Sequence, residues 1–308
     1  MNVDTAARVP TIGRAVASAP PQAYFVVSAV FHYLGPAFAV LLFARVDPLG
    51  VAWLRIASAG AIFAAWRRPW HVVRGIATAT WRLLLALGVV LAVMNSCFYV
   101  AIDRLPLGTV AAIEFLPVIV LAAIGARTLR NGLALALAVP GVYLLTDVRL
   151  EGEPVGVAFA FANAGLFALY IVLAHRVSRS PDIARIDGLA AAMLIASVII
   201  TPIGGWGAAP AFLDPVAIAA GVGVGVASSV IPYVFDQLAM ARLSRASYSL
   251  MVSLLPATAT VIGIVVLAQV PSAIEVIGVA LVVTAVAVHR ERGDPAYELG
   301  TTKKATDA

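Results

Sequence analysis

Three polar residues lie inside long apolar runs of this 308-residue chain, at matching distances from the ends of those runs. Arg55 and Glu114 each lie seven residues after the first residue of their runs, and Asn95 lies seven residues before the last residue of its run. If the runs are α-helices, seven residues correspond to a depth of about 10 Å. At that depth, an arginine can bind a carboxylate through a bidentate pair, and a glutamate can take an ammonium group or a proton.

Ten apolar runs position these residues, and most are close to the ~20 residues that a helix needs to cross a bilayer core. The runs are 22–43, 48–66, 82–102, 107–125, 132–147, 155–176, 186–204, 214–236, 246–268 and 272–289. The chain is 62% hydrophobic and 12% charged, which leaves too little polar surface for a soluble globule. The sequence therefore predicts an all-α integral membrane protein with ten transmembrane helices in contact with the lipid bilayer.

The basic residues are distributed asymmetrically. Seventeen of the 21 Lys and Arg residues fall on one side of the alternating connections, and the opposite connections hold only Arg45, Arg104 and Arg149. The positive-inside rule then predicts a multi-pass protein of the bacterial cell (inner) membrane with both termini cytoplasmic. The net charge of +5 is explained by basic residues in short loops that meet anionic lipid headgroups. The sequence has no basic face interleaved with aromatic residues, so it does not indicate nucleic-acid binding.

The ten runs divide into two groups of five with opposite charge parity. This pattern is expected for a duplicated five-helix unit whose copies insert in opposite orientations. The segments 101–105 and 239–243 are similar, and each precedes a run with a mid-span proline. We therefore expect inverted repeats at 22–147 and 155–289, with cytoplasmic tails at 1–21 and 290–308.

Two interpretations of the buried charges remain open. A charge within the bilayer costs at least ~2.5–3.5 kcal/mol on insertion scales, so each should face protein or water and find a partner. Arg55 and Glu114 could bind substrate and protons, or they could form an ion pair that ties two helices together. Intramembrane ionisable groups are functional by default, which favours the first interpretation.

Further polar residues are weaker candidates for a substrate or proton pathway. His32, beside Gly35-Pro36, could relay protons or simply pack through a hydrogen bond. The other candidates could line a cavity or form helix–helix hydrogen bonds. They are Tyr99, Asn163, Tyr233, Tyr170, Ser228, Ser229, Ser247 and, near a cytoplasmic end, Asp236.

Prolines interrupt several runs. Each removes a backbone donor, and lipid tolerates the freed carbonyl only where protein or water satisfies it. Such breaks can expose backbone to a substrate, or they can be kinks that improve packing. The interruptions are Pro36, Pro117, Pro140, Pro232 and Pro256.

The sequence holds no nucleophile–base pair and no nucleotide motif, and the single Cys97 lacks the partners of a metal site. We therefore expect no enzyme activity, no metal and no cofactor. If the chain moves a small solute, the energy must come from a gradient. An intramembrane enzyme and a passive membrane scaffold are the rivals from other functional classes.

Several motifs resemble the EamA-type proteins of the drug/metabolite transporter superfamily, over roughly residues 25–290. Val51-Ala-Trp-Leu-Arg55 resembles the leucine-arginine motif of their second helix. Further segments are similar to the threonine/homoserine exporters of the RhtA type. These are Met94-Asn95, Phe98-Tyr99, Leu105-Pro-Leu-Gly108, Glu114-Phe115, Ile231-Pro-Tyr233, Leu250-Met251 and Pro256.

The resemblance implies a ten-helix carrier of two EamA repeats that exports amino acids or related metabolites, with proton antiport and Arg55, Asn95 and Glu114 in the site. A drug or other metabolite exporter of the same superfamily is the alternative. The chain departs from the amino-acid exporters at Val40, where they have lysine, and at Leu255, where they have glutamate. It also has Ala268-Gln269 where they have Gly-Glu, so Glu114 is expected to be the only deep carboxylate.

Overall fold

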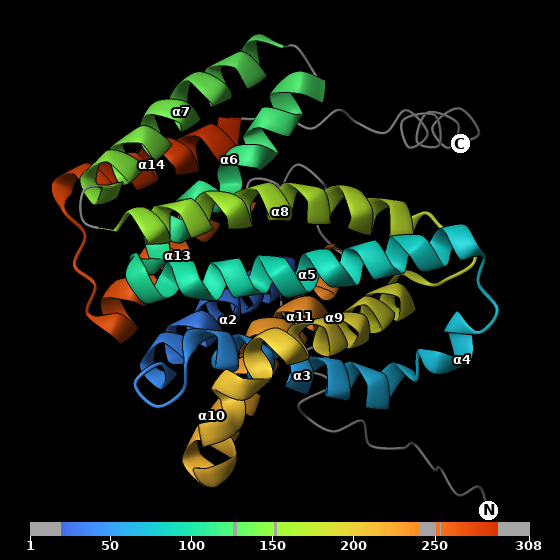
Figure 1. Cartoon of the computed structure of the whole chain (residues 1–308). Helices are drawn as coiled ribbons and strands as arrows, with labels where there is room; N and C mark the ends of the chain where they lie inside the picture. Colours follow the sequence, from blue (N-terminus) through green and yellow to red (C-terminus); the bar gives the residue numbers. More distant parts are fainter. Residues whose placement is uncertain (1–19, 126–127, 151–152, 241–250, 253, 289–308) are drawn as a thin grey trace, which may run out of the picture.

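The computed structural model describes residues 20–125, 128–150, 153–240, 251–252 and 254–288, and every regular element in those residues is a helix (Figure 1). Most of both predicted tails, Ser247 and the side chain of Asp236 lie outside the described residues. The helices are α2 Pro21–Leu42, α3 Pro48–Arg67, α4 Trp70–Val73, α5 Thr78–Arg104, α6 Leu107–Gly125, α7 Leu129–Leu150, α8 Pro154–Ser178, α9 Arg185–Ala208, α10 Pro215–Gly225, α11 Ile231–Met240, α13 Leu255–Leu267 and α14 Ala273–Val288. A 3₁₀ segment, η1 Ala209–Leu213, precedes α10, and a π-helical turn, η2 Val226–Val230, joins α10 to α11.

Each predicted apolar run contains a helix, but the ends differ. Helix α5 begins at Thr78 and ends at Arg104, beyond the run 82–102, because a helix continues into the headgroup region after its apolar residues end. The run 214–236 is three successive helical segments rather than one uniform helix. The short α4 was not predicted, since four residues give no periodic signal.

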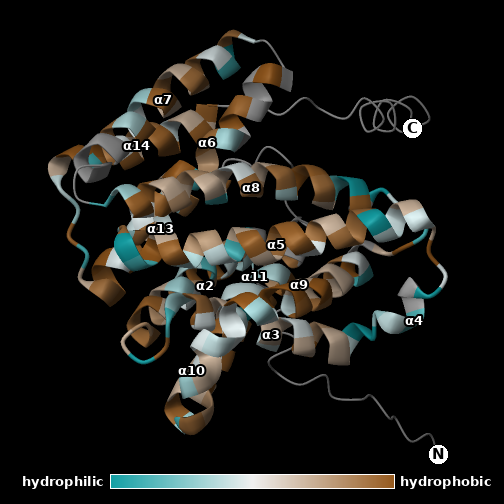
Figure 2. Cartoon of the chain, in the orientation of Figure 1, coloured by the Kyte–Doolittle hydropathy of each residue, from teal (hydrophilic) through white to brown (hydrophobic). Residues whose placement is uncertain are grey.

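Six helices in the described part are long and apolar enough to cross a membrane: α2, α3, α5, α8, α9 with η1, and α10 through α11. The apolar helices within α6, α7, α13 and α14 are shorter. Hydrophobic residues cover the outward faces as well as the interior, while hydrophilic residues gather at helix ends and connections (Figure 2). This distribution is that of a multi-pass membrane protein, whose outward surface meets lipid.

Small residues let helices from the two halves of the chain approach closely. Along α3 and α9, a Cβ at Gly50 would meet the backbone of Gly207, and a Cβ at Gly204 would meet the carbonyl of Leu49. Trp53 Nε1 also donates to Thr201 Oγ1 at 2.9 Å. Small residues are the usual means of close helix packing in membranes.

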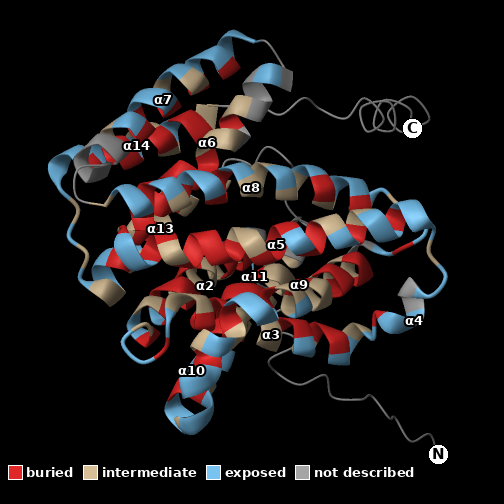
Figure 3. Cartoon of the chain, viewed as in Figure 1, coloured by how far each residue is buried: buried red, intermediate tan, exposed pale blue. Residues whose placement is uncertain are grey.

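The remaining packing surrounds a buried centre. Helix α5 packs along α8 and α9, α2 packs against α10 and α11, and α7 packs against α14 (Figure 1). Buried residues lie on the facing sides of these helices, and the exposed ones point outward (Figure 3). The polar groups predicted to share one depth therefore project into the space between α2, α3, α5, α6 and α8.

Candidate functional site

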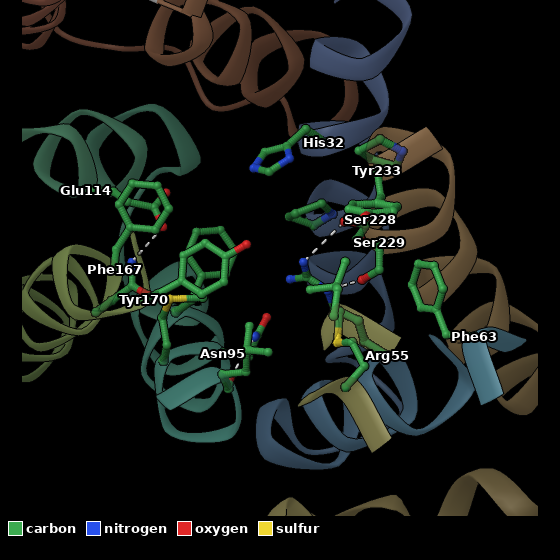
Figure 4. A pocket seen from close by; sticks show the side chains of 18 residues that line it. His32, Arg55, Phe63, Asn95, Glu114, Phe167, Tyr170, Ser228, Ser229 and Tyr233 are labelled. Carbon is green, nitrogen blue, oxygen red and sulfur yellow. Dashed lines mark hydrogen bonds between the residues drawn. The ribbon is translucent and has the colours of Figure 1, made fainter. Parts of the chain in front are cut away.

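A cavity of about 180 Å³ lies between helices from both halves of the chain (Figure 4). Its wall combines three polar groups of the sequence prediction with aromatic and aliphatic side chains. The lining residues are His32, Pro36, Arg55, Phe63, Leu91, Met94, Asn95, Phe98, Glu114, Asn163, Phe167, Tyr170, Leu189, Met193, Ser228, Ser229, Pro232 and Tyr233.

Arg55 projects from α3 and is held by the π-helical turn η2. Its Nε donates to Ser229 Oγ at 3.3 Å, and its Nη2 donates to the carbonyl oxygen of Ser228 at 3.3 Å. The guanidinium carbon also lies 5.6 Å from the ring centroid of Tyr99, a cation–π distance. A guanidinium has five N–H donors, so three remain for a ligand.

Pro232 explains why the carbonyl of Ser228 can accept a hydrogen bond from a side chain. In a regular α-helix the N–H of residue 232 would bond to this carbonyl, but proline has no N–H. The carbonyl of Ser228 accepts from Arg55 instead, so protein satisfies it, as the bilayer requires. Gly35 and Gly225 let α2 and α3 approach this turn, because a Cβ at Gly35 would meet Ser228 and one at Gly225 would meet Ser58 and the Arg55 carbonyl.

Glu114 lies on the opposite side of the cavity from Arg55 (Figure 4). Its side chain is buried on α6, and its Oε1 accepts a hydrogen bond of 3.2 Å from Asn163 Nδ2 of α8. Asn163 is fully buried, and its Oδ1 has no hydrogen-bond partner. This side of the cavity therefore presents the Glu114 carboxylate, and a second acceptor, Asn163 Oδ1, lies enclosed and unpaired beside it.

Arg55 and Glu114 do not form the direct ion pair that the sequence left open as an alternative. The ion pairs among the described residues are Arg45–Asp214 and Arg67–Asp187, each at 2.8 Å. Arg55 and Glu114 instead bond to separate neighbours and leave space between them.

Asn95 of α5 lies between these two sides (Figure 4). Its Nδ2 donates to the carbonyl of Leu91, one turn earlier, at 2.7 Å. The equal depth predicted for Arg55, Asn95 and Glu114 thus corresponds to three helices that meet at one cavity.

The other candidates are placed as follows. His32 and Tyr233 line the cavity, with His32 edge-on to Tyr33 and Tyr233 edge-on to Phe63. Tyr170, Ser228 and Ser229 line it as well. Tyr99 does not line the cavity; it is fully buried, its ring lies beside the Arg55 guanidinium, and its hydroxyl has no hydrogen-bond partner among the described residues.

The apolar part of the wall was missed by the sequence analysis. Apolar residues within apolar helices carry no sign of which ones face a cavity. A spacing signal was nevertheless present, because Asn163, Phe167 and Tyr170 follow one another at four and three residues and so share one helix face. In the described part of the chain no group of three or more His, Cys, Asp or Glu side chains is arranged to hold a metal.

Known proteins resemble this chain in sequence and in fold. Residues 154–289 match the EamA-like transporter family. The threonine/homoserine exporter RhtA of Escherichia coli strain K12 is 30% identical over 254 residues, which cover 82% of this chain and 84% of that protein. The RhtA exporter of Salmonella typhimurium strain LT2 is 29% identical over the same shares.

One solved crystal structure superimposes with a TM-score of 0.53 at 19% identity, over 87% of this chain and 96% of that one. This likeness concerns the fold. Sequence identity along most of the chain is the stronger link, and by it the chain belongs to the EamA-like transporter family, as an RhtA-like membrane transporter.

Proposed function

We propose that this chain is a secondary transporter of the inner membrane that exports amino acids of the threonine/homoserine kind, or related small metabolites, by proton antiport and alternating access. The observation that carries the proposal is the separation of Arg55 and Glu114 across one cavity. Donors line one side and acceptors the other, which is the complement of a zwitterion.

The contacts suit each end of an α-amino acid. A carboxylate can take a bidentate pair from the free N–H groups of Arg55, with the buried, unpartnered Ser228 Oγ as a further donor. An ammonium group has three N–H donors, which Glu114 and Asn163 Oδ1 can receive. Both polar groups of the ligand would then be satisfied without water.

The size of the cavity favours a small solute. Pockets for drug-sized ligands typically measure about 300–1,000 Å³, whereas this cavity measures about 180 Å³. This difference favours the proposal over a drug exporter of the same superfamily, whereas an exporter of another small metabolite fits the volume equally well.

Glu114 is the proposed proton carrier. It is the carboxylate in the cavity wall, and its neighbour Asn163 can donate to it whether or not it carries a proton. A protonated carboxyl group is neutral and binds an ammonium group less tightly than a carboxylate does. Proton binding to Glu114 from outside would therefore favour release of the amino acid.

Helix pairing supports two inverted repeats. Counted along the ten expected spans, α3 with α9, α6 with α13 and α7 with α14 each pair one helix with the helix five positions later. The first span, α2, packs against the eighth, α10–α11, and the sixth span, α8, packs against the third, α5. These two pairs are equivalent when the first and second halves are exchanged. The family match at residues 154–289 coincides with the second expected repeat.

Access from the cytoplasm fits the extent of the cavity. It reaches Phe63 and Leu189, each four residues from a basic helix end, at Arg67 of α3 and Arg185 of α9. These are the ends that the positive-inside rule places in the cytoplasm. Arg55 and Glu114 lie seven residues from the opposite ends of their helices, at Pro48 of α3 and Leu107 of α6.

The test is efflux from a host that lacks its own threonine and homoserine exporters. Cells expressing the chain are loaded with a panel of amino acids and, separately, with cationic dyes and drugs. We expect faster efflux of one or more amino acids and no added resistance to the drugs. Drug resistance without amino-acid efflux, with the protein verified in the membrane, would select the alternative.

A further inference from the structure

The side-chain amide of Asn95 has a determined orientation. The carbonyl oxygen of Leu91 can accept a hydrogen bond but cannot donate one, so the atom that contacts it at 2.7 Å must be Nδ2. The acceptor, Oδ1, therefore points away from the α5 backbone, and Asn95 lies in the cavity wall.

Oδ1 of Asn95 receives no hydrogen bond in the part of the chain that the structure describes. Asn95 is 6% exposed, so little of it reaches bulk water. Its neighbours on the same face of α5, Leu91, Met94 and Phe98, bring no side-chain donor to it. This oxygen is not enclosed by protein, so water in the empty cavity can reach it. A ligand that fills the cavity displaces that water and leaves the acceptor unpaired unless the ligand supplies a donor.

The proposed amino-acid site leaves this acceptor unused. The carboxylate takes the donors of Arg55 and Ser228, and the ammonium takes the acceptors of Glu114 and Asn163. Asn95 lies between these two groups (Figure 4). Much of the remaining wall is aromatic or aliphatic and suits the hydrocarbon of a short side chain.

Resting on the proposed function, we propose that Asn95 Oδ1 accepts a hydrogen bond from the side-chain hydroxyl of the substrate. Asn95 then determines specificity, because it distinguishes hydroxylated amino acids from apolar ones of the same shape. Sites that bond a substrate hydroxyl reject the analogue that lacks it, since the analogue leaves the buried polar group unpaired.

The experiment uses the full chain in exporter-deficient cells and two isosteric pairs: threonine with valine, and homoserine with norvaline. Efflux of the members of a pair is measured in the same cells, so their ratio is independent of the amount of protein. We expect the wild type to prefer the hydroxylated member by on the order of tenfold, and Asn95→Leu to bring the ratio close to one.

The control is Ser96→Ala. Ser96 also donates to a carbonyl one turn earlier, that of Ala92 at 2.9 Å, but it does not line the cavity, so its loss should leave the ratio unchanged. An equal fall in efflux of both pair members in Asn95→Leu, with the ratio unchanged, would overturn the proposal. A wild type without preference would overturn it even if the variant fails to fold.

These results separate the inference from the function beneath it. Efflux of amino acids with no preference for hydroxyl groups contradicts only the role of Asn95. Absence of amino-acid efflux from cells that contain the protein contradicts the proposed function itself.

Discussion

Arg55 donates a 3.3 Å hydrogen bond from Nη2 to the carbonyl oxygen of Ser228, which lies four residues before Pro232. A proline in the second half of the chain thus supplies the backbone acceptor that orients an arginine of the first half. The guanidinium is held through Nε and one Nη2 hydrogen, so its other N–H groups face the cavity. Two features that looked separate in the sequence, a buried charge and a helix break, form one structure.

Replacement of Arg55 by lysine tests the bidentate contact. Lysine retains the charge but offers a point donor instead of a planar fork, and it cannot reach Ser229 and Ser228 in the same way. We expect Arg55→Lys to lower amino-acid efflux at least tenfold at equal membrane content. The exposed Arg104→Lys serves as the control and should leave efflux unchanged.

Glu114→Gln tests proton coupling. Glutamine keeps the shape of the side chain and an acceptor for Asn163 Nδ2, but it cannot exchange a proton. In proteoliposomes, an imposed pH gradient should accelerate amino-acid transport by the wild type and not by this variant. The matched control is Glu275→Gln. Glu275 is also buried, and it accepts from the backbone N–H of Ser272 in a capping box, a position where Gln can replace Glu. Equal acceleration in Glu114→Gln and the wild type would remove Glu114 from the coupling mechanism.

Pro232→Ala tests how Arg55 is positioned. The new N–H at residue 232 can bond to the Ser228 carbonyl and so compete with Arg55 Nη2. We expect KM for the amino acid to rise severalfold while the protein remains folded. Pro140 is exposed on α7 and lies away from the cavity, so Pro140→Ala should not change KM. A normal KM in Pro232→Ala would mean that the serine hydroxyl alone suffices to hold Arg55.

Two glycines of α10 provide a matched test of helix packing. A Cβ at Gly225 would meet Ser58 and the Arg55 carbonyl, whereas one at Gly223 would meet no atom within 4 Å. Overpacking costs about 1–3 kcal/mol, so Gly225→Ala should lower the melting temperature in detergent and reduce efflux. Gly223→Ala should melt at the wild-type temperature or above it, since alanine favours helix over glycine by roughly 0.5–1 kcal/mol. Identical melting of both variants would contradict the close contact between α10 and α3.

The ion pair between Arg45 and Asp214 predicts a pH dependence of stability. The hydrogen bond from Arg45 lowers the pKa of the partly buried Asp214, and the backbone N–H groups of Ala217 and Val216 add to this. A pKa lowered in the folded state stabilises the protein above the ordinary aspartate pKa, and this contribution is lost as the pH falls through the folded value.

The small stability difference between the wild type and Asp214→Asn should therefore be present at pH 7, begin to shrink as the pH falls below about 4, and vanish only below the lowered pKa of the folded state. Melting curves across that range measure it. The exposed Asp103→Asn is the control. A difference that persists in acid would mean that it does not arise from the charge of Asp214, since asparagine keeps the N-cap acceptor for Val216 and Ala217.

The polar part of the site could be predicted from the sequence because charge is costly in a bilayer. That cost made Arg55, Glu114 and Asn95 conspicuous, and counting residues from the run ends placed them at one depth. Tyr99 was left open between a cavity residue and a helix–helix hydrogen bond, and it lies behind Arg55 outside the cavity wall. The sequence does not specify the direction in which a side chain on an apolar helix points.

Helix ends and local distortions were harder to predict. The π-helical turn at Val226–Val230 follows from packing against α2 and α3 and from Pro232, and the apolar sequence alone does not reveal it. Ala268 shows the reverse case. It was noted as a departure from the family's glycine, and the structure gives it a positive φ of 54°, a conformation that favours glycine.

The central claim is that a zwitterion binds between Arg55 and Glu114. Counterflow in proteoliposomes that contain the purified chain tests it most directly, with labelled threonine and three unlabelled competitors: threonine, its methyl ester and its deaminated hydroxy acid. We expect threonine to compete fully and each analogue to compete at least tenfold more weakly, because one side of the cavity loses its partner. An analogue that competes as well as threonine would contradict the account.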